Sequence, residues 1–588
     1  MQRSFDLLRR ALLVASLSLI IPAATVLRCQ GQTPAPAPPP TLTEAERRAV
    51  RDINPETIRR VAADLSSPEM LGRGTAQAGG ERAARYLADR LAGLGLKPLG
   101  DARRSYMQTI KFRATQVLPQ SALIVDEESL ILGEEFVFAP AYEAELAEVS
   151  GPSVFVGYGY GKRRADVRGK IVVMLYGLPF GSRASDNPAQ KAWQSREAMF
   201  ALTGFRINGY AAAGASAIIV VNVESAEEPY PQMADYLMRR RIAHVPITPA
   251  ARIDPAAQFY TTDKTRRSRA LISTARQTTL PPVVYVSPQG SEKLFAEAGK
   301  TLAWALSAAV RRDFAPRELS GATIRARMKI EEATGSNVVG LLEGSDPSLK
   351  EEAVVFTAHY DAYGVGMDGR VYPGAADNAL GVAEVMAVAE ALAHSTERPR
   401  RSVIFLFTTG EEHGLLGSQH WEGYPTWSSE KLAAALNFDG IGTETYGTVR
   451  QVVGYGAAHS ELGALLKEVT AAMGLSLRPD PLPEEKLFYR SDQLTFALHG
   501  VPPLLLMGLP QDVPSAVIRA REWLKTDYHQ PADSVQPWWD WGGAQTMASV
   551  GLVVGMRVAN GERAPDWLPS SPYRRFRQKR SLTSSGGQ

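Results

Sequence analysis

The sequence predicts an α/β protein, in which a mixed sheet flanked by helices carries an inserted, β-rich part. Three observations lead to this prediction. From residue 322 onward, short apolar runs alternate with segments of helical length, which is typical of a sheet covered by helices on both faces. Between 115 and 320 the chain instead has short β-branched runs separated by glycine turns. The composition, 45% hydrophobic and 22% charged, is that of ordinary globular domains.

Composition and charge exclude several classes of protein. A chain of 588 residues with this balance is neither disordered nor collagen-like, and it is not a polytopic membrane protein. Its formal net charge of +3 argues against nucleic acid as a partner. Residues 1–31 hold four arginines and one aspartate, so the rest of the chain is near neutral.

The N-terminus has the features of a signal peptide over 1–31. Three arginines lie within the first ten residues, and 11–27 then runs without a charge. We expect cleavage before Gln32 and an exported protein, periplasmic or extracellular, that has no membrane contact afterwards. The alternative is an uncleaved anchor, although seventeen residues are short for a span of about 20. The single cysteine, Cys29, lies in this segment, so any metal must be bound by His, Asp and Glu.

The elements follow in order along the chain. Residues 32–41 are a proline-alanine linker. The domain that follows begins at 42 with helices, one starting at Asn54-Pro55-Glu56 and one closing on Gly95. In the β-rich part, strands are expected at 154–157, 170–175, 217–222 and 283–286. Further strands are expected at 353–359, 402–408, 433–438 and 503–508, with helices at 379–394, 459–473 and 541–557. The polar, basic tail over 563–588 is predicted to be disordered.

Acids and a histidine follow three of the predicted strands. His359 and Asp361 follow one strand (VVFTAHYDAYG), and Glu411 and Glu412 follow the next (IFLFTTGEEHG). Asp439 follows a third (AALNFDGIG). Ligands of open α/β sheets bind beyond the carboxyl ends of the strands. We therefore expect these side chains to converge on one crevice.

Two further residues complete the candidate set. Asp377 precedes a strongly apolar helix, and His529 lies late in the chain, after Tyr528. Each residue alone has an ordinary explanation: an acidic pair is most often a solvated helix start, and an Asp before a helix is usually an N-cap. The prediction depends on their occurrence together and in this order. The remaining histidines keep such ordinary explanations: His244, His394, His413, His420, His459 and His499.

Taken together, these motifs resemble the co-catalytic di-zinc exopeptidases. They are H-x-D, then G-A-x-D-N-x-x-G before a helix, a Glu-Glu pair after a strand, N-x-D-x-x-G, and a late His. The family includes bacterial leucyl aminopeptidase, aminopeptidase Y and glutamate carboxypeptidase. The resemblance covers roughly 42–114 and 321–560 and implies a zinc-exopeptidase (phosphorylase/hydrolase-like) domain over 42–114 and 321–562. It also implies that the substrate is a peptide.

The resemblance implies a role for each site residue. Asp377 would bridge two zinc ions, with His359 and Asp439 completing one site. Glu412 and His529 would complete the other site. It also implies a cis peptide bond after Asp377.

Three further side chains would act around the metals. Glu411 would be the general base that takes a proton from water. Asp361 would hold the imidazole of His359 in one tautomer. Tyr528 would donate to the oxyanion, a role that a tyrosine has in only some members of the family.

The segment 115–320 resembles the protease-associated domain inserted in many members, through VFVGYGY…DVRGKIVVM and NGYAAAGASAIIVVN. The favoured function is an exported zinc aminopeptidase. Alternatives are a carboxypeptidase of the glutamate carboxypeptidase type, a glutaminyl cyclase relative, and a catalytically inactive receptor-like relative. The oligomeric state does not follow from the sequence.

Overall fold

The computed structural model describes residues 40–139, 144–159, 166–177, 196–223, 230–245, 280–296, 298–311 and 313–577. The predicted signal peptide at 1–31 and nearly all of the predicted linker lie outside these ranges. Within them, no helix combines the length and the apolar character that crossing a membrane requires.

The predicted catalytic sheet is mixed. Its central strands run in the order β11 (Arg317–Leu342), β15 (Ser402–Thr408), β12 (Ala353–His359), β16 (Leu432–Asn437), β19 (Pro503–Pro510) and β17 (Val449–Tyr455). The four strands from β15 to β19 are parallel, whereas β11 and β17 are antiparallel to their neighbours. Short strands β1 (Lys97–Pro98) and β18 (Ser476–Leu477) pair with β11 and β17. The strands expected at 353–359 and 402–408 are confirmed to the residue, and the other two differ by at most two residues at either end.

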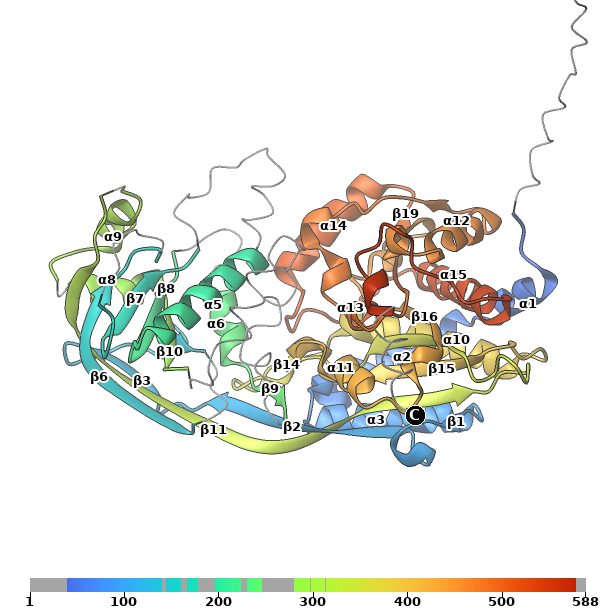
Figure 1. The fold of residues 1–588 in the computed structure, drawn as a ribbon, viewed down its shortest axis with the longest axis horizontal. Coiled ribbons are helices and arrows are strands. Elements are labelled where there is room, and N and C mark those ends of the chain that lie inside the picture. The colour runs from blue at the N-terminus through green and yellow to red at the C-terminus, as the bar shows by residue number, and fades with distance from the viewer. Residues whose placement is uncertain are drawn as a thin grey trace, which may run out of the picture. The chain divides into compact units, whose positions relative to one another are not determined.

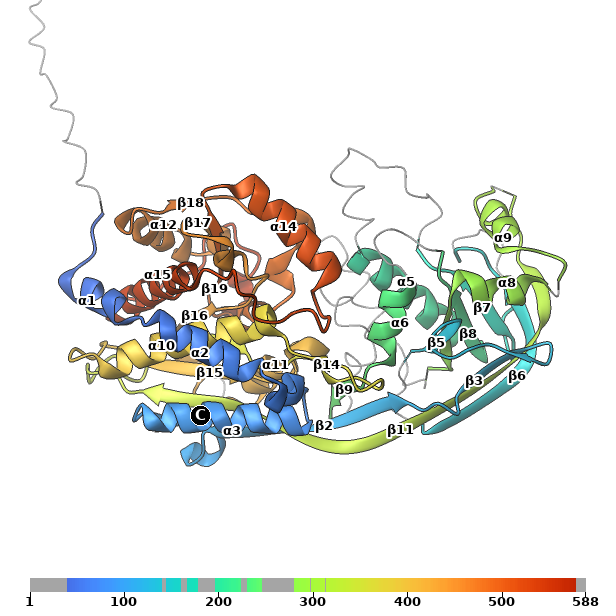
Figure 2. The ribbon, with the colours of Figure 1, turned by 180° about the vertical axis from the view of Figure 1, so that it is seen from behind.

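Helices cover both faces of this sheet. On one face, α2 (Pro55–Leu65) and α10 (Leu380–His394) lie side by side (Figure 2), and α15 (Trp541–Asn560) packs beside α10. Phe356 and Phe405 face these helices and are fully buried. On the other face, α11 (Leu416–Gly423) and α13 (Gln493–Leu498) bring Trp421 and Phe496 against the sheet. Burying a Phe side chain contributes about 1.5–3 kcal/mol, so the two layers fix the sheet firmly.

The remaining helices either precede the sheet in the sequence or pack near its edges. They are α1 (Glu44–Asp52), α3 (Ala78–Gly93), α12 (Leu462–Ala472) and α14 (Val513–Thr526). Asn54 caps α2 by accepting from the backbone N–H of Glu56, with Pro55 at the first helical position, which confirms the predicted helix start.

The β-rich part forms a second sheet that shares β11. Its order is β4 (Glu128–Ser129), β3 (Ala122–Val125), β11, β6 (Leu146–Phe155), β7 (Ile171–Leu175), β8 (Ala217–Val221), β10 (Val283–Val286) and β5 (Phe136–Phe138). Strands β6, β7, β8 and β10 are parallel. The helices of this part are α5 (Arg196–Ala212), α6 (Tyr230–Met238), α8 (Pro288–Ala296) and α9 (Leu302–Ala309).

The two sheets are joined by continuous strands. Figure 1 shows β11 as a long curved strand beside β2 (Met107–Val117), which pairs with residues 328–338 of β11. Strand β9 (Arg241–His244) pairs with the outer edge of β2. The boundaries expected near 114 and 321 therefore fall inside β2 and β11 rather than in linkers, because β11 contributes to both sheets and β2 pairs with its middle.

The predicted disorder of the C-terminal tail is wrong for residues 563–577. Trp567 is buried and donates through Nε1 to the carbonyl of Gly500, 3.1 Å away. The ring of Tyr573 is also buried and packs on Trp567 and Phe488. These aromatic side chains bury enough apolar surface to order a segment whose charges alone suggested disorder. Residues 578–588 lie outside the described ranges.

Candidate active site

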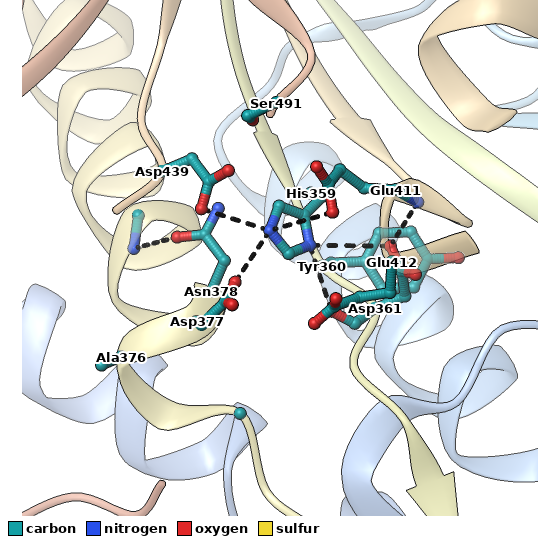
Figure 3. Close-up of polar contacts among 12 residues, drawn as sticks. His359, Tyr360, Asp361, Ala376, Asp377, Asn378, Glu411, Glu412, Asp439 and Ser491 are labelled. Carbon is teal, nitrogen blue, oxygen red and sulfur yellow. Dashed lines mark hydrogen bonds and ion pairs between the residues drawn. The ribbon is translucent and has the colours of Figure 1, made fainter. Parts of the chain in front are cut away.

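Three parallel strands bring their carboxyl ends together. His359 is the last residue of β12, and Asp439 lies two residues beyond β16. Glu411 and Glu412 begin a 3₁₀ turn (Glu411–His413) just after β15. Gly410, with a φ of 75°, makes the left-handed turn that ends the strand there. Figure 3 shows the side chains around the imidazole of His359.

Asp377 and His529 join this group from outside the strands. Asp377 lies in the turn Ala375–Ala379 that precedes α10, and the Asp377–Asn378 peptide bond is cis, as the resemblance implied. His529 lies in the loop after α14. Oδ1 of Asp377 is 3.1 Å from Nε2 of His359, and Oδ2 is 3.2 Å from Nε2 of His529. The two oxygens of one carboxylate thus face the two imidazoles.

The candidate ligand atoms fall into two groups. One comprises His359, Glu411 and Asp439, and the other comprises Asp377, Glu412 and His529, each with its atoms within 4.8 Å of one another. Around Nε2 of His359, the oxygens of Asp377 and Asp439 lie at 3.1 and 3.3 Å, while that of Glu411 lies at 3.9 Å. Glu411 is thus the most distant of the three carboxylates from this nitrogen, although its oxygen belongs to the first group of candidate ligand atoms.

The electrostatics of the site suit bound cations. Burial and the neighbouring acids raise the pKa of Glu411 well above its usual range, although His359 offsets part of this. Burial lowers the pKa of His529, but Glu412 and Asp377 raise it by more. Nε2 of His529 is buried and has no hydrogen-bond partner among the described residues, although two carboxylate oxygens lie within 3.2 Å. An imidazole nitrogen among carboxylates, with no sulfur present, is the donor set of zinc and similar divalent ions.

Asp361 lies beside His359, with a contact that differs from the expected one. Nδ1 of His359 is 3.2 Å from the backbone oxygen of Asp361 and 3.7 Å from its carboxylate Oδ1. The carboxylate itself accepts from Oγ1 of Thr75 at 2.8 Å and from the backbone N–H of Glu411 at 3.2 Å. Asp361 therefore connects β12 to the turn that carries the acidic pair, and its backbone is the nearer acceptor for the imidazole.

Tyr528 is next to His529, and their rings stack with centroids 3.6 Å apart. Its hydroxyl accepts a hydrogen bond from Nη2 of Arg490 at 2.9 Å. Burial raises the pKa of Tyr528 well above its usual range, although Arg490 offsets part of this, and Asp377 and Glu412 raise it further. The hydroxyl is therefore a neutral donor at neutral pH.

Two polar residues that the sequence analysis did not single out hold the turn of Asp377. The buried carboxylate of Asp533 accepts from the backbone N–H groups of Ala376 and Asp377, at 2.8 and 3.1 Å. The amide of Asn378 donates to the carbonyl of Phe438 at 2.9 Å, next to Asp439. A Cβ on Gly381 would lie 2.3 Å from that same carbonyl oxygen, which explains the final glycine of D-N-x-x-G.

Arg73 is a third residue that the sequence analysis did not single out. Its fully buried guanidinium donates to four carbonyl oxygens, those of Leu65, Tyr360, Pro373 and Gly374. It thereby ties the chain after His359 to the turn before Asp377. The only sequence signal was an arginine between glycines (LGRGT), which gives no hint of partners almost 300 residues away.

This combination of fold and site defines a class: the metal-dependent hydrolases built on a mixed α/β sheet, with acids and histidines at the strand ends. The comparisons agree. Residues 337–554 match the model of Peptidase family M28. This segment therefore has the features of an M28 peptidase domain.

Sequence relatives match a small part of the chain. A vacuolar membrane protease of Yarrowia lipolytica is 29% identical over 124 residues, 21% of this chain and 12% of that one. A "Probable zinc metalloprotease" of Leptosphaeria maculans is 37% identical over 112 residues, 19% of this chain and 25% of that one. The chain thus spans between about a tenth and a quarter of the length of these relatives.

Solved structures match over most of the chain. An aminopeptidase from Aneurinibacillus sp. strain AM-1 superposes with a TM-score of 0.55 at 15% identity, covering 88% of this chain and 97% of that one. A zinc aminopeptidase from Bacillus subtilis superposes with a TM-score of 0.50 at 17% identity, covering 89% and 98%. At these identities the likeness shows the fold, and it confirms the expected α/β architecture.

These comparisons contradict the predicted localisation, which is periplasmic or extracellular after export. Several of the curated relatives are vacuolar membrane proteases of fungi, and this finding overturns the prediction of export. A basic flank with an apolar stretch is a weak guide here, because targeting segments for several destinations share that pattern.

Proposed function

We propose that the chain is a zinc-dependent aminopeptidase that removes N-terminal residues from peptides with the help of two zinc ions. The carboxylate of Asp377 supports this most, because its two oxygens lie 3.1 and 3.2 Å from the Nε2 atoms of His359 and His529. A short carboxylate in this position suits two cations at once. His359 and Asp439 would complete one site, and Glu412 and His529 the other.

The chain's own groups account for the proton transfers. When bound, the zinc ions would polarise the scissile carbonyl and lower the pKa of a water. Glu411, buried at the edge of the ligand set, takes the proton of the attacking water and delivers it to the leaving amine. The hydroxyl of Tyr528 is the candidate donor to the developing oxyanion.

The charge around the site favours an amino-terminal substrate. A carboxypeptidase needs a cation that binds the terminal carboxylate of its substrate. The arginines near this site already donate to other groups of the protein. Arg73 donates to backbone carbonyls, Arg490 pairs with Glu485, and Arg239 pairs with Asp235. The acidic surroundings would instead attract the protonated amine of a peptide. A catalytically inactive relative is disfavoured because each metal-ligand position keeps a suitable residue.

Blocked peptides test the proposal directly. We expect cleavage of a peptide with a free N-terminus and an amidated C-terminus, and no cleavage of its N-acetylated counterpart with a free C-terminus. A chelator should abolish the activity, and added zinc should restore it together with about two bound ions per chain. The reverse preference would establish a carboxypeptidase, and full activity in metal-free protein would overturn the metal assignment.

A further inference from the structure

We propose that Arg239, which lies between α6 and β9 in the β-rich part of the chain, is a positioning residue for the metal ligand His529. The inference rests on the proposed function, since it takes His529 as a zinc ligand. It adds a residue from outside the matched M28 segment to the support of the metal site.

Arg239 reaches the loop of His529 directly. Its side chain is only 5% exposed, and Nη2 donates to the backbone carbonyl of His529 at 2.7 Å, across 290 positions of sequence. The same nitrogen pairs with Oδ2 of Asp235. This carbonyl belongs to the ligand residue itself, so the hydrogen bond fixes the peptide unit from which the imidazole projects.

The guanidinium also fixes an aromatic side chain against the imidazole. The Arg239 guanidinium carbon lies 4.3 Å from the ring centroids of both Tyr363 and Tyr372, which is close cation–π contact. The hydroxyl of Tyr363 lies 3.3 Å from Nδ1 of His529, and their ring centroids are 4.7 Å apart. Arg239 therefore acts on His529 twice, once through the backbone and once through the tyrosine that contacts the nitrogen opposite Nε2.

His529 needs such support because of its own backbone. Its φ of 59° is left-handed, a region that residues with a Cβ adopt only where their surroundings hold them. The stacked ring of Tyr528 covers the imidazole and Tyr363 meets its Nδ1. In a histidine that binds a metal, one ring nitrogen faces away from the metal. A hydrogen-bond partner for that nitrogen sets the orientation and tautomer of the ring.

The charge of Arg239 is itself held in place, so the contact is a built feature. Asp235 pairs with Arg239 and with Nη2 of Arg370, and its Oδ1 also accepts from the Tyr372 hydroxyl at 2.8 Å. A buried cation with a carboxylate partner and two aromatic faces has a defined orientation. Arg370 pairs with the same carboxylate, but its side chain is 51% exposed, and within the described residues its hydrogen bonds and ion pairs are with Asp235 and Asp368.

Removing Arg239 should therefore weaken zinc binding at the group formed by Asp377, Glu412 and His529. Loss of an outer partner of a metal ligand typically costs 10–100-fold in metal affinity. We expect Arg239→Met to raise the zinc dissociation constant of one of the two sites by about 10–100-fold. The site completed by His359 and Asp439 should change much less, because the hydrogen bonds and ion pair of Arg239 go to Asp235 and His529 rather than to either of these residues.

The experiment compares four full-length proteins: wild type, Arg239→Met, Arg239→Lys and the matched control Arg370→Met. Metal-free protein is titrated with zinc against a chromophoric chelator to obtain both dissociation constants, and its melting temperature is recorded to check the fold. Arg370→Met should match the wild type. Arg239→Lys, which keeps the charge and one donor but loses the planar fork, should recover part of the lost affinity.

The outcomes separate the two proposals. If Arg239→Met binds both zinc ions with wild-type affinity, Arg239 does not position His529. If Arg239→Met and Arg370→Met weaken zinc equally, the effect comes from Asp235 and the inference is again wrong. If the wild type itself binds no zinc, the proposed function fails, and with it the ligand role of His529. A variant whose metal-free form melts like the wild type but binds zinc more weakly at one site supports the inference.

Discussion

The two sheets of this protein share β11 and a similar parallel core, yet the residues that follow their strands differ. In the M28 domain, β12, β15 and β16 lead into His359, the pair Glu411-Glu412, and Asp439. In the β-rich part, the parallel strands β7, β8 and β10 lead into Tyr176, Asn222 and Ser287. None of these three described positions offers a carboxylate or an imidazole.

The difference teaches that topology supplies the crevice and the sequence supplies its chemistry. Parallel strands end at the same edge in both sheets, so either edge could gather side chains from distant segments. Among the described residues that directly follow these strands, acids and histidines occur at the first edge. The β-rich part contributes instead through Arg239, by a backbone hydrogen bond. The following predictions test these different roles of the two sheets, beginning with the largest expected effect.

The acidic pair gives the sharpest test of the first sheet. Glu411→Gln removes the proposed base and should lower kcat by at least about 10²-fold while zinc content stays near that of the wild type. Glu412→Gln should lower both zinc content and activity, because it replaces a ligand. Zinc analysis and steady-state kinetics on the same preparations distinguish these outcomes. Wild-type turnover in Glu411→Gln would show that the roles of the pair are assigned wrongly.

Much of this first sheet could be predicted from the sequence. Strands 353–359 and 402–408 read as uninterrupted apolar runs because they are buried on both faces, and the structure agrees to the residue. All eight predicted site residues lie at or beside one edge of the sheet. They could be predicted because acids and histidines directly after such strands are unusual and occurred in a fixed order.

The remaining features depend on contacts that leave no local pattern. Arg73 and Arg239 act through hydrogen bonds to backbone carbonyls, which any sequence offers. The boundaries of the β-rich part lie inside β2 and β11, because β11 runs through both sheets and β2 pairs with its middle. Residues 563–577 read as a basic tail, although a few aromatic side chains are enough to anchor them.

Asp533 tests whether the turn of Asp377 is held from outside. Asp533→Ala removes the acceptor of two backbone N–H groups, at Ala376 and Asp377, and should weaken zinc binding by about 10–100-fold. Asp533→Asn keeps one acceptor oxygen and should have a smaller effect. Ser534→Ala is the matched control, since its hydroxyl only accepts from Gln536 and donates to Ala532 nearby. Wild-type zinc affinity in Asp533→Ala, or an equal loss in Ser534→Ala, would contradict the role of Asp533.

Removal of the β-rich part tests whether it limits access to the site. Its α6 contacts the last turn of α14, which precedes the loop of His529, with Nε2 of Gln232 donating to the carbonyl of Lys525 at 3.3 Å. We predict that the intact protein prefers short peptides, with kcat/KM at least about tenfold lower for a folded protein than for a dipeptide, or about 1.4 kcal/mol. The expected cause is crowding of the approach to His529.

The shortened variant can be designed from the pairing of β2 with β11. Val117 pairs with Met328, so an Asn-Gly turn in place of 118–327 would close the two strands into a hairpin. This variant lacks Arg239, so its kinetics are measured at saturating zinc. If it folds and keeps the same preference for short peptides, the β-rich part does not restrict access.

The smallest expected effect concerns a buried acid of α10, on the core side of the first sheet. Glu384 is 3% exposed, and its Oε1 has no hydrogen-bond partner among the described residues. Burial raises the pKa of Glu384 well above its ordinary 4.5, and Glu444, itself raised by burial to about 7, raises it further. In the unfolded chain Glu384 ionises above about pH 4.5, whereas the folded protein keeps the proton. The folded state therefore loses stability as the pH rises from there toward the folded pKa, by up to about 1.4 kcal/mol per pH unit.

Glu384→Gln removes this dependence, so the melting temperature of the variant relative to wild type should rise steadily between pH 5 and pH 8. The control is Glu81→Gln on α3, whose side chain is 65% exposed and which should run parallel to wild type. A constant difference between Glu384→Gln and wild type across this range would mean that Glu384 is ionised in the folded protein, with a cation or a rearranged partner beside it.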